Sequence, residues 1–409
     1  MAAVCFYFQV HQPLRLRRYS VFDASAEYFD HAANTQILRK VANKCYLPAT
    51  KLLLELTQRY RSEFRISFSL TGTVLRQFQQ HTPEVLDHFK ALADTGCVEL
   101  LAETDHHALA CLYSHDEFTQ QIDLHNALIE DTFGQRPAVF RNTELIYANP
   151  IAKAVAALNR YSGILAEGVD ALLDGRSPNA VYTPPGLPQL PLLLKNYKLS
   201  DDLAFRFSDP NWPGYPLTPQ AYTDAILNAP AASEGNTPAP PDPLVNLFMD
   251  FETFGEHQWA DTGIFTFLEQ FPQTFLEAGG RFLTPSEALD EFEPVGAYDA
   301  PHMTSWADSE RDLSAWLGNA MQSSALQELY TLEPKIKATE AAADPTLLRD
   351  WRQLTTSDHF YYMATKYAGD GQVHDYFNPY ASPYDAYINF MNVMDHLRTR
   401  LQNLTPTHS

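Results

Sequence analysis

The amino-acid sequence predicts an α/β protein in which about seven strands form a parallel barrel, followed by an α-helical region. Short apolar runs alternate with segments of helical periodicity, and strand signals end near Leu283. This alternation indicates parallel strands, and the nearly continuous apolar character of the runs suits strands buried on both faces. About seven such strands are typical of a parallel barrel, although a doubly wound sheet would give a similar pattern.

Each predicted strand is a short apolar or alternating run that ends at polar or turn-forming residues. The predicted strands are 4–10, 64–70, 98–102, 138–140, 163–166, 204–207 and 244–250. Helices are predicted between them by apolar residues at helical spacing in PATKLLLELTQRY, PEVLDHFKALADTG and HDEFTQQIDLHNALIEDTFG, the last two of which end at glycine. Strand and helix therefore alternate along the predicted barrel.

Two regions follow from this pattern. Residues 1–285 form the predicted barrel, and residues 286–409 form a helical domain that we expect to contribute to the rim of the barrel. Within the barrel, the Pro-rich stretch 229–243, APAASEGNTPAPPDP, is predicted to be a loop inserted before the last strand. In the C-terminal region, apolar residues recur at helical spacing in 313–321 and 390–401. The absence of an internal repeat disfavours a solenoid or a propeller.

The chain is strongly acidic. It has 29 Lys and Arg against 50 Asp and Glu, which gives a formal net charge of −21 that is spread along the sequence. A field of this sign repels polyanions, so nucleic acid and anionic membrane surfaces are poor partners. A neutral sugar polymer is indifferent to the field, whereas solubility benefits from it.

The N-terminal segment and the cysteines predict a reducing, cytoplasmic location. The segment MAAVCFYFQVHQP lacks a basic region, and its apolar run of about seven residues is too short for a signal peptide or a membrane span. Cys5, Cys45, Cys97 and Cys111 form no CxxC pair and fall in predicted strands or helices, which favours reduced core thiols over disulfides or zinc ligands. Neither a P-loop nor a GxGxxG after a strand is present, so we expect no nucleotide cofactor.

Polar residues directly follow four of the predicted strands. In a parallel barrel the carboxyl ends of the strands meet at one rim, and the active site lies there. The polar segments are His11 to Pro13, Glu103 to His107, Arg141 to Glu144 and Asp250 to His257. Carboxylates, histidines, an arginine and amides are therefore expected to converge on one rim.

Two rim carboxylates on separate strands could carry out glycoside hydrolysis. That reaction needs a general acid for the leaving oxygen and a second carboxylate that attacks the anomeric carbon or activates water. Asp250 and Glu252 end the apolar run LVNLFMDFE, where an unpaired charge is costly unless it is used. Glu252 is the rival of Asp250 because both lie on one face of the strand. Spacing alone favours a surface or helix-capping carboxylate at Glu144 over a catalytic one.

Four motifs resemble, in order, signature regions of family 57 of the glycoside hydrolases. They are HQP after the first strand, GCVELLAETDHHA, FRNTELIY and MDFETFGEHQ, and a fifth is placed at SWADSERDLSAWLGNA. The resemblance spans residues 1 to about 320. It implies an incomplete (β/α)7 barrel followed by a helical region, a retaining mechanism, and action on α-glucans such as starch, glycogen and maltooligosaccharides. Catalysis by two carboxylates requires neither a metal nor another cofactor.

The resemblance implies Glu144 as the nucleophile and Asp250 as the general acid/base. Substrate-binding roles are predicted for His11, Glu99, His107, Arg141, Trp212, His257 and Trp306. Among these, Glu99 could instead pair with Arg141, and the two tryptophans are included because indole rings stack on sugar faces. The second motif departs from the family pattern at Asp105 to His107, where many relatives carry aromatic residues, so the sugar subsites are expected to differ.

The sequence leaves several functions open. The motif MDFETFGEHQ and the modest chain length favour an α-amylase, and 4-α-glucanotransferase, branching enzyme and α-galactosidase are the alternatives. In another class, Asp105, His106, His107 and His115 could bind a cation, as in a metal-dependent deacetylase or phosphoesterase, although their spacing does not suit one helix face. A non-catalytic glucan-binding protein is disfavoured because both carboxylates are present.

Overall fold

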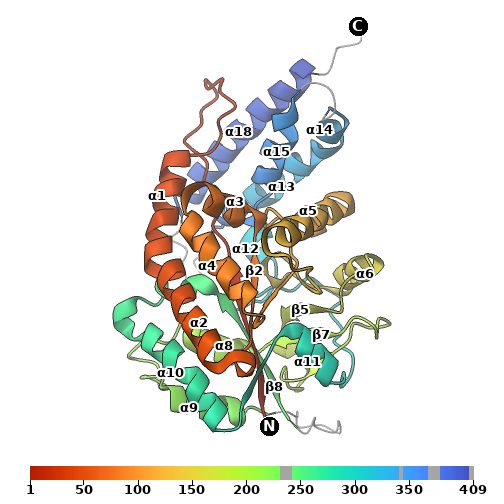
Figure 1. The fold of residues 1–409 in the computed structure, drawn as a ribbon. Coiled ribbons are helices and arrows are strands. Elements are labelled where there is room, and N and C mark those ends of the chain that lie inside the picture. Colours follow the sequence, from red (N-terminus) through yellow and green to blue (C-terminus); the bar gives the residue numbers. More distant parts are fainter. Residues whose placement is uncertain (231–241, 340–343, 367–377, 405–409) are drawn as a thin grey trace.

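The computed structural model describes residues 1–230, 242–339, 344–366 and 378–404. Its strands are β1 (Ala3–Val10), β2 (Ile66–Leu70), β3 (Val98–Leu100), β4 (Val139–Arg141), β5 (Gly163–Glu167), β6 (Val181–Tyr182), β7 (Leu192–Lys195), β8 (Leu244–Asp250) and β9 (Arg281–Leu283). They belong to a single sheet, which runs through the lower half of the molecule in Figure 1.

Seven strands form the main path of this sheet. Their order is β3-β2-β1-β8-β7-β5-β4, and every neighbouring pair along it is parallel. Beyond β3, Ala102 forms an isolated parallel bridge with Phe140 of β4, so the two ends of the path meet. A complete TIM barrel has eight strands, so this is an incomplete barrel of that type, and the predicted fold class is confirmed.

Strand β1 lies in the middle of the sheet and is buried along its whole length. It pairs with β2 on one side and β8 on the other. Because side chains alternate along a strand, its two faces join different cores. Val4, Phe6, Phe8 and Val10 join the core shared with the outer helices, whereas Ala3, Cys5 and Tyr7 join the core inside the barrel. The carboxyl end of β1 thus carries His11 to the rim.

Helices cover the outside of the barrel. They are α1 (His31–Val41), α2 (Leu47–Tyr60), α3 (Gly72–His81), α4 (Pro83–Asp94), α5 (His115–Phe133), α6 (Asn149–Ala157), α7 (Asp170–Leu173), α8 (Tyr197–Ala204), α9 (Pro219–Leu227), α10 (Ile264–Glu277) and α11 (Pro285–Glu291). The three helices predicted from sequence correspond to α2, α4 and α5 and are confirmed. Ser114 caps the start of α5 by accepting from the Glu117 N–H, and Gly134 ends this helix in the left-handed conformation.

One predicted strand is wrong. Residues 204–207 lie at and after the end of α8, and the strand in this part of the barrel is β7. Asn196 accepts a hydrogen bond from the Leu199 N–H at 3.0 Å, which starts a helix directly after β7. Leu203 and Phe207 are buried in the core shared with β8, so their apolar character reflects a packed helix face and turn.

The C-terminal third is helical. Its helices are α12 (Ser314–Leu317), α13 (Ala320–Thr331), α14 (Glu333–Thr339), α15 (Pro345–Leu354), α16 (Ser357–Tyr361) and α18 (Pro383–Leu404). Most of them gather at the top of Figure 1, opposite the N-terminus. The predicted segment 313–321 is interrupted because Asn319 caps the start of α13, whereas 390–401 lies within α18.

The barrel and the C-terminal helices share a hydrophobic core. One cluster contains Phe118 and Phe140 of the barrel together with Trp316, Trp351 and Phe390 of the C-terminal helices. The predicted division after residue 285 falls at the first residue of α11, just after β9, and stays a prediction. The common core nevertheless fixes the later helices against the carboxyl ends of the strands.

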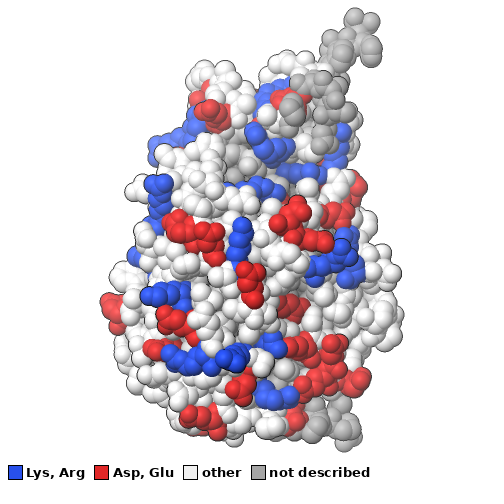
Figure 2. Space-filling view, in the orientation of Figure 1, with Lys and Arg blue, Asp and Glu red and all other residues white. Residues whose placement is uncertain are grey.

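Charges of both signs are interspersed on the face shown in Figure 2. Within the part of the chain that the structure describes, no helix is both long and apolar enough to cross a bilayer. Most of the predicted Pro-rich loop, 229–243, lies outside the described residues.

Candidate active site

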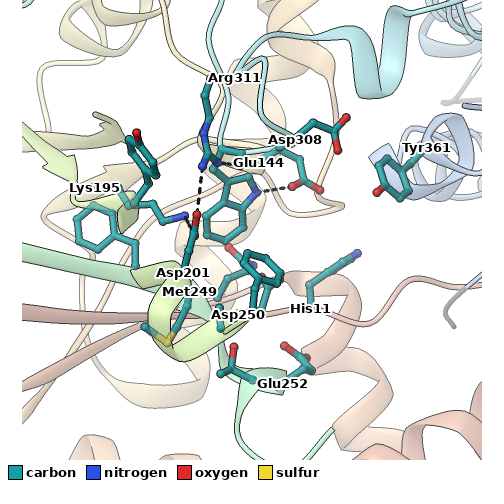
Figure 3. Close-up of a pocket in the computed structure, with 18 of the residues that line it drawn as sticks. His11, Glu144, Lys195, Asp201, Met249, Asp250, Glu252, Asp308, Arg311 and Tyr361 are labelled. Atoms are coloured by element: carbon teal, nitrogen blue, oxygen red, sulfur yellow. Dashed lines mark hydrogen bonds and ion pairs between the residues drawn. The ribbon is translucent and has the colours of Figure 1, made fainter. Parts of the chain in front are cut away.

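A cavity of about 820 Å³ opens at the carboxyl ends of the strands. Small-molecule sites usually have volumes of roughly 300–1,000 Å³. Its walls include His11 after β1, Glu144 after β4, Lys195 at the end of β7, Asp250 at the end of β8, and Asp358 of α16. Figure 3 shows how His11, Glu144, Lys195 and Asp250, which are distant in sequence, face one space. The cavity therefore lies where a parallel barrel places its active site.

The backbone of Glu144 adopts a conformation that is unusual for glutamate. Glu144 lies in a 3₁₀ turn after β4 with φ 58° and ψ 25°, and Leu145 also has a positive φ of 50°. Such a conformation costs a residue other than glycine about 1–3 kcal/mol and is retained where the surroundings enforce it. Leu145 is buried in the core inside the barrel, which anchors the turn, while Glu144 lines the cavity.

Three donors hold the Glu144 carboxylate. The Nε2 atom of His107 lies 3.1 Å from Oε1, Trp306 Nε1 donates to Oε2 at 2.7 Å, and Ser357 Oγ donates to Oε1 at 3.3 Å. These donors come from the segment after β3, from the segment before α12 and from the start of α16. Because the Glu144 side chain is still 20% exposed, its carboxylate is oriented and open to the cavity.

His107 lies between two carboxylates. Its Nδ1 is 3.2 Å from Glu103 Oε2, and its Nε2 faces Glu144. Burial lowers the pKa of His107, but the hydrogen bonds with Glu103 and Glu144 outweigh burial and raise this pKa to about 9. Burial raises the pKa of Glu144, but the hydrogen bond and the charge of His107 outweigh it and leave this pKa below its ordinary value. At neutral pH Glu144 is therefore an anion, and His107 is a cation that donates to both carboxylates.

The pKa values of Asp250 and Glu252 are raised, whereas that of Glu144 is lowered. Burial, followed by the negative charge of Glu144, raises the pKa of Asp250 to about 6. Burial, followed by the charge of Asp250, raises the pKa of Glu252 to about 8, and Tyr46 donates its hydroxyl hydrogen to Glu252. An ionised carboxylate and a protonated carboxyl group can thus face one cavity, which is the pair of states that glycoside cleavage needs.

Asp358 of α16 is a cavity residue that the sequence did not reveal. Its carboxylate accepts a hydrogen bond from His11 Nε2 at 3.0 Å, and His11 Nδ1 lies 2.9 Å from the Thr71 hydroxyl. The His11 ring also stacks on that of His107, with 4.2 Å between ring centroids. The available sequence signal was the aromatic run that follows Asp358, because Tyr361 and Tyr362 line the same cavity.

Three other predicted substrate-binding residues lie in or beside the cavity. Trp306 and His257 line it, and burial lowers the pKa of His257 to about 4, so its ring is neutral at physiological pH. Arg141 is fully buried beside the wall. Its guanidinium carbon lies 4.8 Å from the centroid of the Trp306 ring, and its Nη1 lies 3.8 Å from Glu103. Arg141 therefore supports Trp306 from behind.

Glu99 lies away from the cavity lining, which corrects its predicted position at the rim. Its carboxylate accepts hydrogen bonds from the backbone N–H and the hydroxyl of Ser286 at 2.9 and 2.5 Å. The predicted alternative of a pair with Arg141 is also wrong, because Glu103 is the carboxylate beside Arg141. The physical reason is depth along the strand: Glu99 lies within β3, and the polar segment that reaches the rim begins only at Glu103.

Trp212 also lies outside the cavity lining. The guanidinium carbon of Arg206 lies 5.7 Å from the centroid of its ring, and Gly214 packs so closely that an added Cβ would lie 2.5 Å from the indole. Arg206 itself lines the cavity, so Trp212 lies beside a lining residue and is not itself part of the lining.

A cluster of four charges on one side of the cavity was not predicted. Lys195 Nζ lies 3.4 Å from Asp201 and 3.7 Å from Glu167, and Arg311 reaches the same two carboxylates at 3.2 and 3.8 Å. In Figure 3 Lys195, Asp201 and Arg311 lie on the opposite side of the cavity from His11 and Tyr361. The cluster joins the ends of β5 and β7 to α8 and to the segment before α12.

The profile described as "Glycosyl hydrolase family 57" matches residues 5–301, which is most of the chain and includes both Glu144 and Asp250. The chain belongs to glycosyl hydrolase family 57. The predicted resemblance is therefore confirmed. This family-57 chain is also 38% identical over 403 residues to a Methanocaldococcus jannaschii protein named "Putative alpha-amylase", and the match covers 96% of this chain and 83% of that protein.

Solved structures with similar folds include other family-57 enzymes. A family-57 branching enzyme from Pyrococcus horikoshii gives a TM-score of 0.68 at 14% identity, with 99% of this chain and 92% of that chain covered. A 4-alpha-glucanotransferase from Thermococcus litoralis gives 0.64 at 14% identity, with 96% of this chain covered. The family-57 chain spans 59% of the length of that glucanotransferase. At these identities the similarity concerns the fold, and it agrees with the incomplete barrel described above.

The residues considered for a metal site do not converge in this family-57 protein. Asp105 accepts two hydrogen bonds from Arg76 at 2.8 and 2.9 Å and lies 2.8 Å from His106, whereas His107 faces the carboxylate of Glu144. Across the described ranges, no group of three or more His, Cys, Asp or Glu residues is arranged to hold a metal ion. The geometry therefore gives no support to the deacetylase alternative.

Proposed function

We propose that this protein is a retaining glycoside hydrolase of the α-amylase type, which cleaves α-1,4-linked glucans such as starch, glycogen and maltooligosaccharides. One observation carries the proposal: two carboxyl groups of one cavity have pKa values shifted in opposite directions, below the ordinary value for Glu144 and to about 6 for Asp250. When the surroundings lower the pKa of one carboxyl group and raise that of another, the first is suited to be the nucleophile and the second to be the acid.

In the proposed first step, a Glu144 oxygen attacks the anomeric carbon, and the bond from that carbon to the glycosidic oxygen breaks. Asp250 transfers its proton to the leaving oxygen, so a glycosyl-enzyme ester and a shortened glucan result. In the second step, water attacks the same carbon, and the Asp250 carboxylate takes a proton from that water. The bond between the anomeric carbon and Glu144 breaks. Two inversions at the anomeric carbon give net retention.

The surroundings of each carboxyl group support these roles. Glu144 is ionised and its two oxygens are held by His107, Trp306 and Ser357, which restricts the direction of attack. Asp250 is protonated below a pH of about 6 and becomes an anion once it has given up its proton, as a residue that alternates between acid and base must.

The choice of α-glucan and of hydrolysis is supported by the family and by the relative named "Putative alpha-amylase". Proteins of similar fold are named as a branching enzyme and a glucanotransferase. The point to test is therefore whether water or a sugar hydroxyl accepts the glycosyl group. The free, mostly buried cysteines are consistent with a reducing compartment, and we place the enzyme in the cytoplasm.

The decisive experiment is incubation of the purified protein with maltoheptaose and amylose. We expect only shorter sugars, and proton NMR at early times should show the α-anomer of each new reducing end. Longer maltooligosaccharides would instead identify a glucanotransferase, and new branch points a branching enzyme. An initial β-anomer would exclude retention, and inertness toward both substrates would refute the α-glucan assignment.

Substitution of Glu144 tests the nucleophile. Glu144→Gln should lower kcat at least about 10³-fold, because the amide cannot form the covalent intermediate. The matched control is Glu333→Gln, which alters another largely buried glutamate, one that accepts from Ser114 at 2.7 Å outside the cavity. Unchanged activity of Glu144→Gln would show that the nucleophile is another residue.

A further inference from the structure

The segment from Ser305 to Asp312, called here the 305–312 turn, forms one wall of the cavity. Residues 306–311 all line it. Asp308 and Arg311 both have a φ of 52°, a left-handed conformation that residues other than glycine adopt only where contacts enforce it. The turn closes on itself, since the Ser305 N–H donates to the Arg311 carbonyl at 3.1 Å and the Ser305 hydroxyl donates to the Asp312 carbonyl at 2.6 Å.

The 305–312 turn is connected directly to Glu144. Trp306 gives its indole N–H to Glu144 Oε2 at 2.7 Å and its backbone N–H to the Glu144 carbonyl at 3.2 Å. Trp306 is therefore hydrogen-bonded to both the side chain and the backbone of Glu144. Any displacement of Trp306 would change the direction in which the Glu144 carboxylate points.

Arg311 anchors this turn to the barrel. Its Nη1 donates to the carbonyl oxygen of Trp306, and its Nη2 donates to Asp201 at 3.2 Å. Glu167, at the end of β5, lies 3.8 Å from Nη1, and the guanidinium carbon lies 4.7 Å from the centroid of the Tyr197 ring. The Arg311 side chain is only 15% exposed, so these interactions are weakly screened by solvent.

We propose that Arg311 is a positioning residue that holds Trp306 against the strand ends and thereby aims the Glu144 carboxylate at the anomeric carbon. The inference rests on the proposed role of Glu144. It goes beyond that role because Arg311 acts at a distance. The hydrogen bonds of Arg311 go to Trp306 and Asp201, and Trp306 in turn is one of the donors to Glu144. The fixed fork of the guanidinium suits this double contact, which a lysine could make only in part.

The test compares Arg311→Met with Arg176→Met on maltoheptaose. Arg176 is a matched control because it also holds backbone carbonyls, those of Leu173 and Ala297 at 2.8 and 2.7 Å, and it lies outside the cavity lining. Arg311→Met should lower kcat on the order of 100-fold, the effect of a small misplacement of a reacting group. KM should change less than about threefold, because binding is separate from the aim of the nucleophile.

A pH profile separates positioning from general loss of structure. When Trp306 no longer donates to Glu144, the carboxylate loses a stabilising hydrogen bond, so the acidic limb of kcat/KM should move to higher pH in Arg311→Met. Arg176→Met should retain the wild-type limb. An unshifted limb, or a loss confined to KM, would overturn the proposal.

Two further variants keep the inference testable if Arg311→Met does not fold. Arg311→Lys should keep the fold and show an intermediate loss in kcat, and Asp201→Asn, which weakens the anchor from the other side, should shift the acidic limb in the same direction. Wild-type kcat in both variants would overturn the proposal. Because wild-type activity is measured first, an inactive wild type counts against the proposed function, and an active wild type with active variants counts against the role of Arg311 alone.

Discussion

Glu144 and Asp250 make the activity depend on pH in a predictable way. The proposed mechanism needs Glu144 ionised and Asp250 protonated in the free enzyme. Because the pKa of Glu144 is below its ordinary value and that of Asp250 is about 6, we expect kcat/KM to be highest between the two values. It should fall at lower pH as Glu144 gains a proton, and above pH 6 as Asp250 loses one. A profile on maltoheptaose that still rises between about pH 6 and pH 8 would contradict the assignment.

Lys195 offers a check on the alkaline limb of that profile. Burial and Glu144 raise the pKa of Asp250, and the positive charge of Lys195 is among the influences that lower it. Lys195→Met should therefore move the alkaline limb to higher pH. Lys198→Met is the matched control, because it removes an exposed lysine that lies 3.4 Å from Asp170, and it should leave the limb in place.

Glu252 is the rival of Asp250, and two amide substitutions separate them. Asp250→Asn should lower kcat roughly 10²–10⁴-fold, because it removes the proposed acid. Glu252→Gln should cost less than about tenfold, because Glu252, with a pKa of about 8, is already neutral at pH 7 and an amide can still accept the Tyr46 hydrogen bond. The reverse order of the two effects, measured on maltoheptaose at pH 6, would identify Glu252 as the acid.

Sequence patterns located some cavity residues and missed others for a physical reason. His11 and Asp250 stand directly after or at the end of apolar strands, so a one-dimensional pattern is enough to place them at the rim. Asp358 and Arg311 reach the cavity from a helix and a turn whose position depends on packing over long sequence distances. Glu144 falls between the two cases, since its left-handed backbone has no signature in the residue type.

At the scale of elements, Gly255 joins the turn after β8 to the π-helical turn Ala42–Tyr46 that precedes α2. It has a φ of 112°, and an added Cβ would lie 2.0 Å from the Lys44 carbonyl oxygen. We expect Gly255→Ala to lower the free energy of unfolding by roughly 2–5 kcal/mol, through backbone strain and overpacking together. Urea denaturation followed by circular dichroism measures this value.

Gly175→Ala is the control for that substitution. Gly175 also has a positive φ, of 78°, but no atom lies within 4 Å of the position that a Cβ would occupy. Gly175→Ala should lower the free energy of unfolding by about 1–2 kcal/mol, from backbone conformation alone. Equal losses for the two variants would show that the close approach at Lys44 contributes nothing.

Element type was predictable where an amphipathic pattern was long. The helices α2 (Leu47–Tyr60), α4 (Pro83–Asp94) and α5 (His115–Phe133) have several turns, so their apolar spacing is distinctive. Strand β7 is only four residues long. The apolar residues at the end of α8 and in the turn after this helix look as much like a short strand as β7 does. In so short a run, the cap at Asn196 decides between helix and strand, and periodicity does not.

At the scale of the whole molecule, the barrel and the C-terminal helices should unfold together. One hydrophobic cluster contains residues of both regions, and Arg352 of α15 donates to Glu117 of α5 at 2.8 and 3.2 Å. Thiol labelling of the buried Cys5 and Cys45 follows the barrel, while fluorescence of Trp316 and Trp351 is expected to be sensitive to the C-terminal helices. We expect the two probes to give one common urea midpoint, and two separated midpoints would indicate independent domains.

The barrel could be predicted from sequence because each strand and helix pair is a local unit with its own periodicity. The position of the last third could not, because it depends on one core assembled from residues such as Phe140 and Phe390. The difference between local patterns and long-range packing also explains the cavity residues. Those that directly follow β1 and β8 could be predicted, whereas Asp358 of α16 could not.

The left-handed backbone at Glu144 has a practical consequence for capturing an intact oligosaccharide in crystals. An inactivated enzyme is usually made with glutamine or alanine at the nucleophile, for which we proposed Glu144. Both residues would keep the conformational penalty at this position while losing part of the hydrogen-bond network that offsets it. Glycine adopts a φ of 58° without strain, so Glu144→Gly should be the better-tolerated knockout. The vacated space would also admit a small anion or a glycosyl fluoride of inverted configuration, so position 144, the proposed nucleophile, is the natural starting point for a glycosynthase.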